Sequence, residues 1–335
     1  MKVLIVANYK PSVGGISGQV ALLHQCLNKE GILADIFSTK ASIFSRLKMF
    51  YSLRKMSKRY DVLHVHGCSY LGFFPVILGV TIAKQLKKRV ICTYHGGGAE
   101  RFFERYSWLV KYYLNRTNQN IVLSGFLAKI FDKYSVNYQI IPNILQINKS
   151  VYRERQEVRP KFISVRSLQP LYNVECIIRA FAIVKESNPE AELRILGNGI
   201  CRSELEILTA KLNLRNVYFE GFVPNTEIYD YLNKADIFVS VPKIDNQPMS
   251  VLEAFNCGLL VISSRVGGIP YLVDENRTGV LVESNNHNEL AEKMIWAVEH
   301  PKESIKMIKA AYKELDKYQW EEMKVKILKL YQPNN

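Results

Sequence analysis

The sequence lacks several motifs that would assign a function directly. It has no D-x-D pair for holding a nucleotide through a metal ion, and no G-x-S-x-G nucleophile elbow of a serine hydrolase. Its six cysteines are scattered without a C-x-x-C pair or metal-finger spacing, which is typical of reduced thiols in a cytoplasmic protein. The longest apolar run, residues 71–83, has 13 residues and contains Pro75. A bilayer requires ~20 such residues, so we expect a cytoplasmic protein without a spanning segment.

The composition indicates a globular protein whose two halves carry different charge. Apolar residues make up 48% of the 335 residues and charged residues 23%, and the length suffices for two domains. Residues 1–160 hold 24 Lys and Arg against 8 Asp and Glu, whereas residues 161–335 hold 21 against 23. This asymmetry favours an anionic partner for the first domain.

Short β-rich runs alternate with helical patterns along the whole chain. The expected strands are 3–7, 33–38, 61–66, 89–94, 120–124, 138–142, 161–165, 191–196, 217–222, 235–240, 259–264 and 279–283. Near-continuous apolar strands between helices predict parallel sheets covered on both faces. The polar stretch 143–160 is the best linker, so we expect domains at 1–150 and 160–315. Ligands of such sheets bind at the carboxyl ends of the strands.

Glycines follow two expected strands of the first half. Gly14 and Gly15 precede a helix starting near Ile16, where backbone N–H groups can approach a phosphate; a plain turn is the alternative. His95 follows the strand at 89–94 and precedes three glycines. The missing nucleophile elbow argues against a serine esterase, so His95 is expected to hydrogen-bond a ligand hydroxyl or shield developing charge. A purely structural histidine is the alternative.

Two other patterns are weaker. His64 and His66 share one face of a strand, but a metal site needs a third ligand that nothing nearby supplies. We expect both histidines to have a packing role. In the stretch LGNGIC (196–201), Arg202 follows where a dinucleotide fingerprint has its third glycine, which argues against an NAD site.

The stretch DNQPMSVLEAF (245–255) joins a buried strand to a short helix and contains two carboxylates, Asp245 and Glu253. If the helix begins near Pro248 or Met249, its free N–H groups and the positive end of its dipole favour an anion such as a diphosphate. Glu253 is placed to accept two hydroxyls of a ribose. Its alternative role is to stabilise the helix dipole.

Residues 245–290 resemble the signature region of the family 4 glycosyltransferases, retaining enzymes with the GT-B fold. The family pattern is E-x7-E followed by A-x-x-C-G, then G-G-x-P-E and a later T-G-x-L-V. Further matching stretches are the Gly14-Gly15 pair, DVLHVHG, the His95 loop, SGFLAKIF (124–131), IPN (141–143) and LGNG. The resemblance covers almost the whole chain. It implies two doubly wound, Rossmann-like α/β domains facing across a cleft, with a C-terminal helix at 318–332 packing back on the first domain.

The resemblance also implies roles for individual residues. Glu253 would bind the ribose of a nucleotide sugar, and Asp245 would reach the sugar hydroxyls. His95 would contact the donor sugar near the reaction centre, and Gly15 would approach the diphosphate. We include Gly14, Asn246, Met249 and Ser250 among the donor-binding residues.

The match departs from the family at the residues that hold the diphosphate. In the segment 164–181, the positions of the family's Arg and Lys are occupied by Ser167 and Tyr172. Arg166 is one position off, an offset that reverses a side chain along a strand but can be absorbed in a loop. Departure of a diphosphate needs positive charge. We therefore expect Arg166 and Lys243 to be the replacement cations, and we expect no metal or other cofactor.

The segment 42–60 carries six basic residues and no acid, interleaved with apolar side chains. A basic amphipathic helix of this kind fits an anionic membrane surface. The segment 101–116 adds aromatic residues suited to an interface, namely Phe102, Phe103, Trp108, Tyr112 and Tyr113. Ordinary surface helices are the alternative. Nucleic acid is not expected as a partner, because no recognised nucleic-acid motif is present.

These observations predict a retaining glycosyltransferase of glycan or polysaccharide biosynthesis, peripheral on the inner face of a membrane. It would move a sugar from a nucleotide sugar, with UDP favoured, to a saccharide or lipid-linked saccharide. The alternative is a non-catalytic binding or regulatory subunit of the same fold, favoured by the altered clamp. A nucleotide-sugar epimerase is a weaker rival within enzymes.

Overall fold

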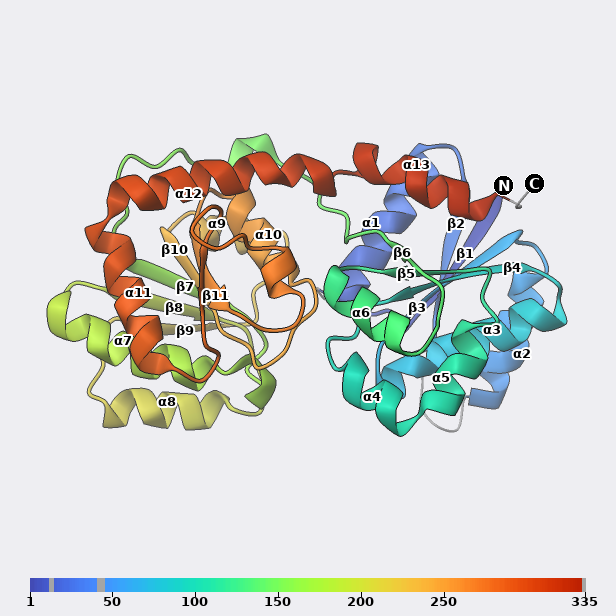
Figure 1. Cartoon of the computed structure of the whole chain (residues 1–335), viewed down its shortest axis with the longest axis horizontal. Coiled ribbons are helices and arrows are strands. Elements are labelled where there is room, and N and C mark those ends of the chain that lie inside the picture. The colour runs from blue at the N-terminus through green and yellow to red at the C-terminus, as the bar shows by residue number, and fades with distance from the viewer. Residues whose placement is uncertain (12–14, 41–45, 333–335) are drawn as a thin grey trace. The chain divides into compact units, whose positions relative to one another are not determined.

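A computed structural model describes residues 1–11, 15–40 and 46–332. The chain divides into two compact units (Figure 1). Unit 1 comprises Met1–Gln146 together with Lys317–Asn335, and unit 2 comprises Ile147–Asp316. Each unit is an α/β structure with its own core.

Unit 1 is built on a parallel sheet in the order β2-β1-β3-β4-β5-β6. Its strands are β1 (Lys2–Ala7), β2 (Leu33–Ser38), β3 (Val62–Gly67), β4 (Arg89–Tyr94), β5 (Gln119–Val122) and β6 (Gln139–Ile140). Successive side chains of a strand point to opposite faces. Leu4 and Val6 accordingly join one core cluster, and Val3 and Ile5 join a second one.

Helices cover both faces of this sheet. They are α1 (Ile16–Lys29), α2 (Arg46–Ser57), α3 (Phe74–Gln85), α4 (Ala99–Arg105), α5 (Ser107–Leu114), α6 (Gly125–Lys133) and α13 (Trp320–Tyr331), with a short 3-10 helix η2 (Tyr70–Phe73) before α3. Residues of α2 to α6 pack in the first cluster, and residues of α1 and α13 pack in the second. The last helix of the chain is therefore part of the core of unit 1.

Unit 2 repeats the design with the strand order β12-β11-β10-β7-β8-β9. Its strands are β7 (Lys161–Val165), β8 (Glu192–Leu196), β9 (Val217–Gly221), β10 (Ile237–Ser240), β11 (Leu260–Ser264) and β12 (Val280–Val282). Its helices are α7 (Val174–Ser187), α8 (Arg202–Lys211), α9 (Ile228–Leu232), α10 (Met249–Asn256), α11 (His287–Glu299) and α12 (Pro301–Lys313).

The fold class expected from the sequence is confirmed as two doubly wound parallel sheets. Each of the twelve expected strands is present among the described residues, with ends shifted by up to two residues. The largest difference is β6, which is two residues long and exposed rather than spanning 138–142. Within the described ranges, no helix combines the length and hydropathy needed to cross a membrane.

The expected interfacial residues divide between the core of unit 1 and its surface, where Trp108 and Tyr112 are exposed. Met49 and Leu53 of α2 are buried, and so are Phe102 and Phe103 of α4, which pack against other rings of unit 1. The helical period turns these side chains toward the sheet. The start of the basic segment, residues 42–45, lies outside the described residues.

Candidate functional site

In unit 2 the polar residues gather where the sheet changes direction. The chain runs from β7 outward to β8 and β9, and then returns to place β10 on the other side of β7. Such a switch point leaves a crevice at the carboxyl ends of the two central strands, which is where doubly wound sheets bind ligands. Arg166 directly follows β7, and Asp245 lies in the loop after β10. Their side chains meet, with Arg166 Nη2 2.6 Å from Asp245 Oδ2.

Asp245 is fixed by the loops on both sides. Its Oδ1 accepts a hydrogen bond from the N–H of Asn246 at 2.7 Å, and its carbonyl accepts one from the N–H of Gly268 at 2.9 Å. Gly267 has φ +54°, and a Cβ there would lie 2.0 Å from the Asp245 carbonyl oxygen. Glycine is required at this position for both its backbone conformation and its closeness to Asp245.

Arg166 is held by two further neighbours. Its Nε donates to Ser240 Oγ at 3.1 Å, and its guanidinium carbon lies 5.0 Å from the centre of the Tyr172 ring. Tyr172 occupies the position where the resembling family has a lysine. In this chain the residue supports the neighbouring cation through a cation–π contact and supplies no charge of its own.

Glu253 lies in the second turn of α10, which begins at Met249 as the sequence predicted. Burial raises the pKa of Glu253 to about 7, while the charge of Arg166 acts in the opposite direction. The carboxyl is therefore partly protonated near neutral pH in the unliganded protein. An incoming group that donates hydrogen bonds favours the ionised form.

Three further residues expected to bind the donor, Asn246, Met249 and Ser250, lie around the start of α10. Asn246 is 1% exposed and Ser250 is 8% exposed. The Oγ of Ser250 is buried and has no hydrogen-bond partner among the described residues. A buried hydroxyl without a partner is rare, and this one lies in the first turn of α10, where the helix dipole favours an anion.

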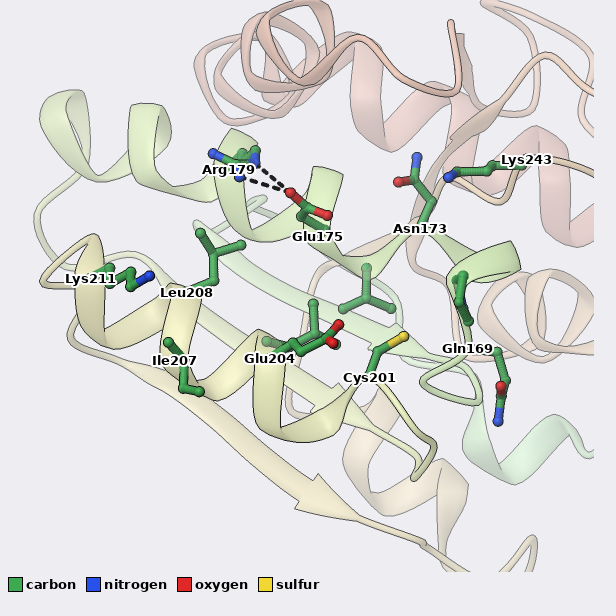
Figure 2. A pocket seen from close by; sticks show the side chains of 13 residues that line it. Gln169, Asn173, Glu175, Arg179, Cys201, Glu204, Ile207, Leu208, Lys211 and Lys243 are labelled. Atoms are coloured by element: carbon green, nitrogen blue, oxygen red, sulfur yellow. Dashed lines mark hydrogen bonds and ion pairs between the residues drawn. The ribbon is translucent and has the colours of Figure 1, made fainter.

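Lys243 is exposed and lines a pocket that contains neither Arg166 nor Asp245 in its wall. A pocket of about 410 Å³ lies between α7 and α8, and Lys243 contributes to its wall. Figure 2 shows Lys243 and Lys211 at opposite ends of this pocket, with Asn173 near Lys243. No hydrogen bond or ion pair in the described residues joins the Lys243 side chain to Arg166 or Asp245. The structure therefore brings together Arg166 and Asp245, and leaves Lys243 apart from that pair.

In unit 1 the corresponding switch point lies between β1 and β3. Gly15 precedes α1 with φ +65°, and a Cβ there would meet nothing within 4 Å. Among the described residues no side-chain cap is bonded to the start of α1, and the N-terminus of a helix favours an anion. Gly14 lies outside the described residues.

His95 follows β4 in the same unit. Its N–H donates to the carbonyl of Gly67 at 2.8 Å, and its Nε2 lies 2.9 Å from Nδ1 of His66. Burial lowers the pKa of His95 to about 4. The side chain is therefore a neutral hydrogen-bonding group at neutral pH and not a cation.

The two histidines of β3 differ in their surroundings. His64 is buried and bonded to Tyr331 Oη at 2.6 Å and Thr93 Oγ1 at 2.8 Å, which fits the expected packing role. His66 contacts His95 instead, a pairing that was not predicted from the sequence. One feature of the sequence pointed to this pairing. His66 lies at the carboxyl end of β3, and His95 follows the neighbouring strand β4.

Two family models match the chain in the same order as its two units. The Glycosyltransferase Family 4 model matches residues 30–148, and the Glycosyl transferases group 1 model matches residues 148–314. The catalytic class expected from the sequence is confirmed by these matches and by the named relatives below.

Sulfoquinovosyl transferase SQD2 of Arabidopsis thaliana is 26% identical over 80% of this chain, which spans about 55% of that protein's length. Alpha-monoglucosyldiacylglycerol synthase of Streptococcus pneumoniae is 24% identical over 80% of the chain and 71% of its own length. Among solved structures, Anabaena Alr3699/HepE in complex with UDP has a TM-score of 0.79 at 16% identity, covering 98% of this chain and 99% of that one. The chain belongs to the group 1 glycosyltransferases of family 4 type and has the GT-B fold.

Proposed function

We propose that this glycosyltransferase moves a sugar from a UDP-sugar to a saccharide or lipid-linked saccharide, with retention at the anomeric carbon. The observation that carries the proposal is the arrangement at the switch point of unit 2. There a cation, Arg166, is paired with Asp245 next to Glu253 and the N-terminus of α10. These groups match the charge of a diphosphate and the hydroxyls of a ribose and a sugar.

In this proposal Arg166 and the helix N-termini stabilise the negative charge that develops on the departing diphosphate. Lys243 is exposed and can add charge as a second cation, and no metal is required. Glu253 accepts the two ribose hydroxyls, while Asp245 and the neutral His95 hydrogen-bond the sugar. Asn246, Met249 and Ser250 line the approach to the diphosphate at the start of α10.

In the proposed reaction one bond forms and one bond breaks at the anomeric carbon. The acceptor oxygen forms a bond to the anomeric carbon as the bond from that carbon to the diphosphate breaks. The acceptor proton passes to the departing diphosphate oxygen on the same face of the sugar, which gives retention. This scheme needs no covalent intermediate with the protein.

The choice of UDP is supported by a structural neighbour that was solved with UDP. A lipid-linked acceptor is supported by the relative named alpha-monoglucosyldiacylglycerol synthase. The positive charge of the first 160 residues supports contact with an anionic membrane surface on the cytoplasmic side. The exposed apolar side chains suited to such contact are Tyr70, Leu71, Trp108 and Tyr112.

Incubation of purified protein with UDP-, GDP- and ADP-sugars tests the proposal when release of nucleoside diphosphate is measured with and without saccharide or lipid-linked acceptors. We expect acceptor-dependent release from a UDP-sugar, and NMR of the product should show the anomeric configuration of the donor. An inverted product would contradict the retaining mechanism. Binding of UDP without turnover of any donor across a broad acceptor panel would favour the alternative, a non-catalytic subunit.

A further inference from the structure

His66 and His95 form a histidine pair at the carboxyl ends of the neighbouring strands β3 and β4. Nδ1 of His66 lies 2.9 Å from Nε2 of His95, and the two rings stack with centroids 5.2 Å apart. His66 is 4% exposed, whereas His95 is half-buried. The pair thus consists of an inner ring within the core and an outer ring that a ligand can reach.

The backbone fixes the outer ring relative to the inner one. The N–H of His95 donates to the carbonyl of Gly67, the residue after His66, at 2.8 Å. A Cβ on Gly96 would lie 2.9 Å from Ser69 Oγ and 3.0 Å from Ser69 N, so the loop is packed tightly against the end of β3. Ser69 Oγ is in turn bonded to Tyr94 Oη at 2.8 Å.

Both rings are neutral, because burial lowers the pKa of His66 well below its usual value and that of His95 to about 4. A hydrogen bond between two neutral imidazoles requires that one nitrogen donates and the other accepts. If His95 donated through Nε2–H, the proton of His66 would sit on Nε2. That atom is buried without a partner among the described residues.

A buried N–H without a partner is rarer than a buried acceptor without one. The opposite arrangement, with His66 donating through Nδ1–H, leaves Nε2 of His66 as a bare acceptor. This arrangement is therefore the less costly one.

We propose that His66 is a positioning residue for His95. It donates its Nδ1–H to Nε2 of His95, and so keeps the proton of His95 on Nδ1. That N–H is bonded to no described residue and is left to donate to a hydroxyl oxygen of the donor sugar. The last step rests on the proposed function, whereas the assignment of the proton does not.

Nitrogen NMR of the full chain with isotope-labelled histidine tests the proton assignment in the free protein, with peaks assigned through His66→Asn and His95→Gln. At neutral pH we expect a protonated Nδ1 and an unprotonated Nε2 for His95. The reverse pattern would overturn the proposal. This measurement requires no substrate, so it determines the position of the His95 proton even if the proposed donor class is wrong.

Kinetics with an active donor test the positioning role. His66→Phe removes the donor but keeps a ring, and His66→Asn keeps an N–H near the place of Nδ1. We expect kcat/KM to fall roughly 5-fold or more in His66→Phe and to recover in His66→Asn, as for loss of one hydrogen bond. Tyr331→Phe, which removes a bond to His64 in the same cluster, is the matched control and should change kcat/KM little. Equal losses in all three variants would show a merely structural effect and contradict positioning.

Discussion

Arg166 donates to Asp245, which lies 79 residues later in the chain, with Nη2 and Oδ2 2.6 Å apart. The two residues follow β7 and β10, which are neighbours in the sheet. Side-chain exposure is 12% for Arg166 and 20% for Asp245, so the pair is shielded but still reachable. The position of Arg166 replaces an arginine expected one residue later. The charge at this edge of unit 2 is therefore retained by a different residue.

Arg166→Ala should lower kcat/KM by about 10²-fold, because it removes a cation from the charge that develops on the diphosphate. Steady-state kinetics with a UDP-sugar measure the effect. Arg194→Ala is a matched control, since Arg194 also pairs with a carboxylate, that of Glu220. Its guanidinium carbon lies 4.6 Å from the centre of the Tyr218 ring. A similar loss in both variants would indicate a general effect of removing a partly buried arginine.

The glycine beside Asp245 gives a second prediction. Gly267→Ala should destabilise the protein and weaken nucleotide binding, because the new methyl group collides with the Asp245 carbonyl. Gly31→Ala introduces the same backbone strain, at φ +75°, without any atom within 4 Å. We expect a loss of ~1 kcal/mol in the free energy of unfolding for Gly31→Ala and ~2–3 kcal/mol for Gly267→Ala. Chemical denaturation checks both, and equal losses would contradict the role of Gly267 in placing Asp245.

Glu253 predicts a pH dependence of stability. Its pKa in the folded protein, about 7, is above its usual value of 4.5. The folded state therefore holds the proton more tightly, and the free energy of unfolding should fall as pH rises from about 4.5 to about 7, by up to ~3 kcal/mol. Denaturation curves across this range should show the fall in the parent and lack it in Glu253→Gln. A fall of the same size in Glu253→Gln would assign the effect to other groups.

The same carboxyl predicts a pH dependence of nucleotide binding. Only the ionised form accepts both hydroxyls of a ribose, so the affinity for UDP should rise about 10-fold between pH 6 and pH 8. Calorimetry at the two pH values measures this change. An affinity that is constant with pH in the parent would contradict a ribose contact through Glu253.

The fold could be predicted because each buried strand is a local apolar run, as in β3 and β10. The site could be predicted only in part. Ser240 and Tyr172 contact Arg166 because β10 lies beside β7, an adjacency that the strand order decides and no local pattern reveals. The expected linker likewise contains Arg155, which is buried and bonded to Asp236 at 2.8 Å. The polar composition of this segment predicted an exposed linker. The sequence alone does not show that Arg155 has a partner 81 residues away in the chain.

Trp108 gives a prediction for the membrane surface. It is 72% exposed, and the other two tryptophans, Trp296 and Trp320, are partly buried. Vesicles containing anionic lipid should shift the tryptophan emission to the blue in the parent and not in Trp108→Phe. Leu71→Ser should weaken vesicle binding, whereas Ile200→Ser, which removes a similarly exposed apolar residue of unit 2, should not. No emission shift with anionic vesicles would contradict insertion at Trp108.

The central claim is that unit 2 binds a nucleoside diphosphate with Glu253 on the ribose. Thermal unfolding of the parent and of Glu253→Ala with UDP, GDP, ADP and CMP tests it most directly. A ligand at 100 times its dissociation constant stabilises a protein by ~2.7 kcal/mol, which is readily measured. We predict that UDP raises Tm in the parent and not in Glu253→Ala. If no nucleotide raises Tm in the parent, or if UDP stabilises both proteins equally, the claim is contradicted.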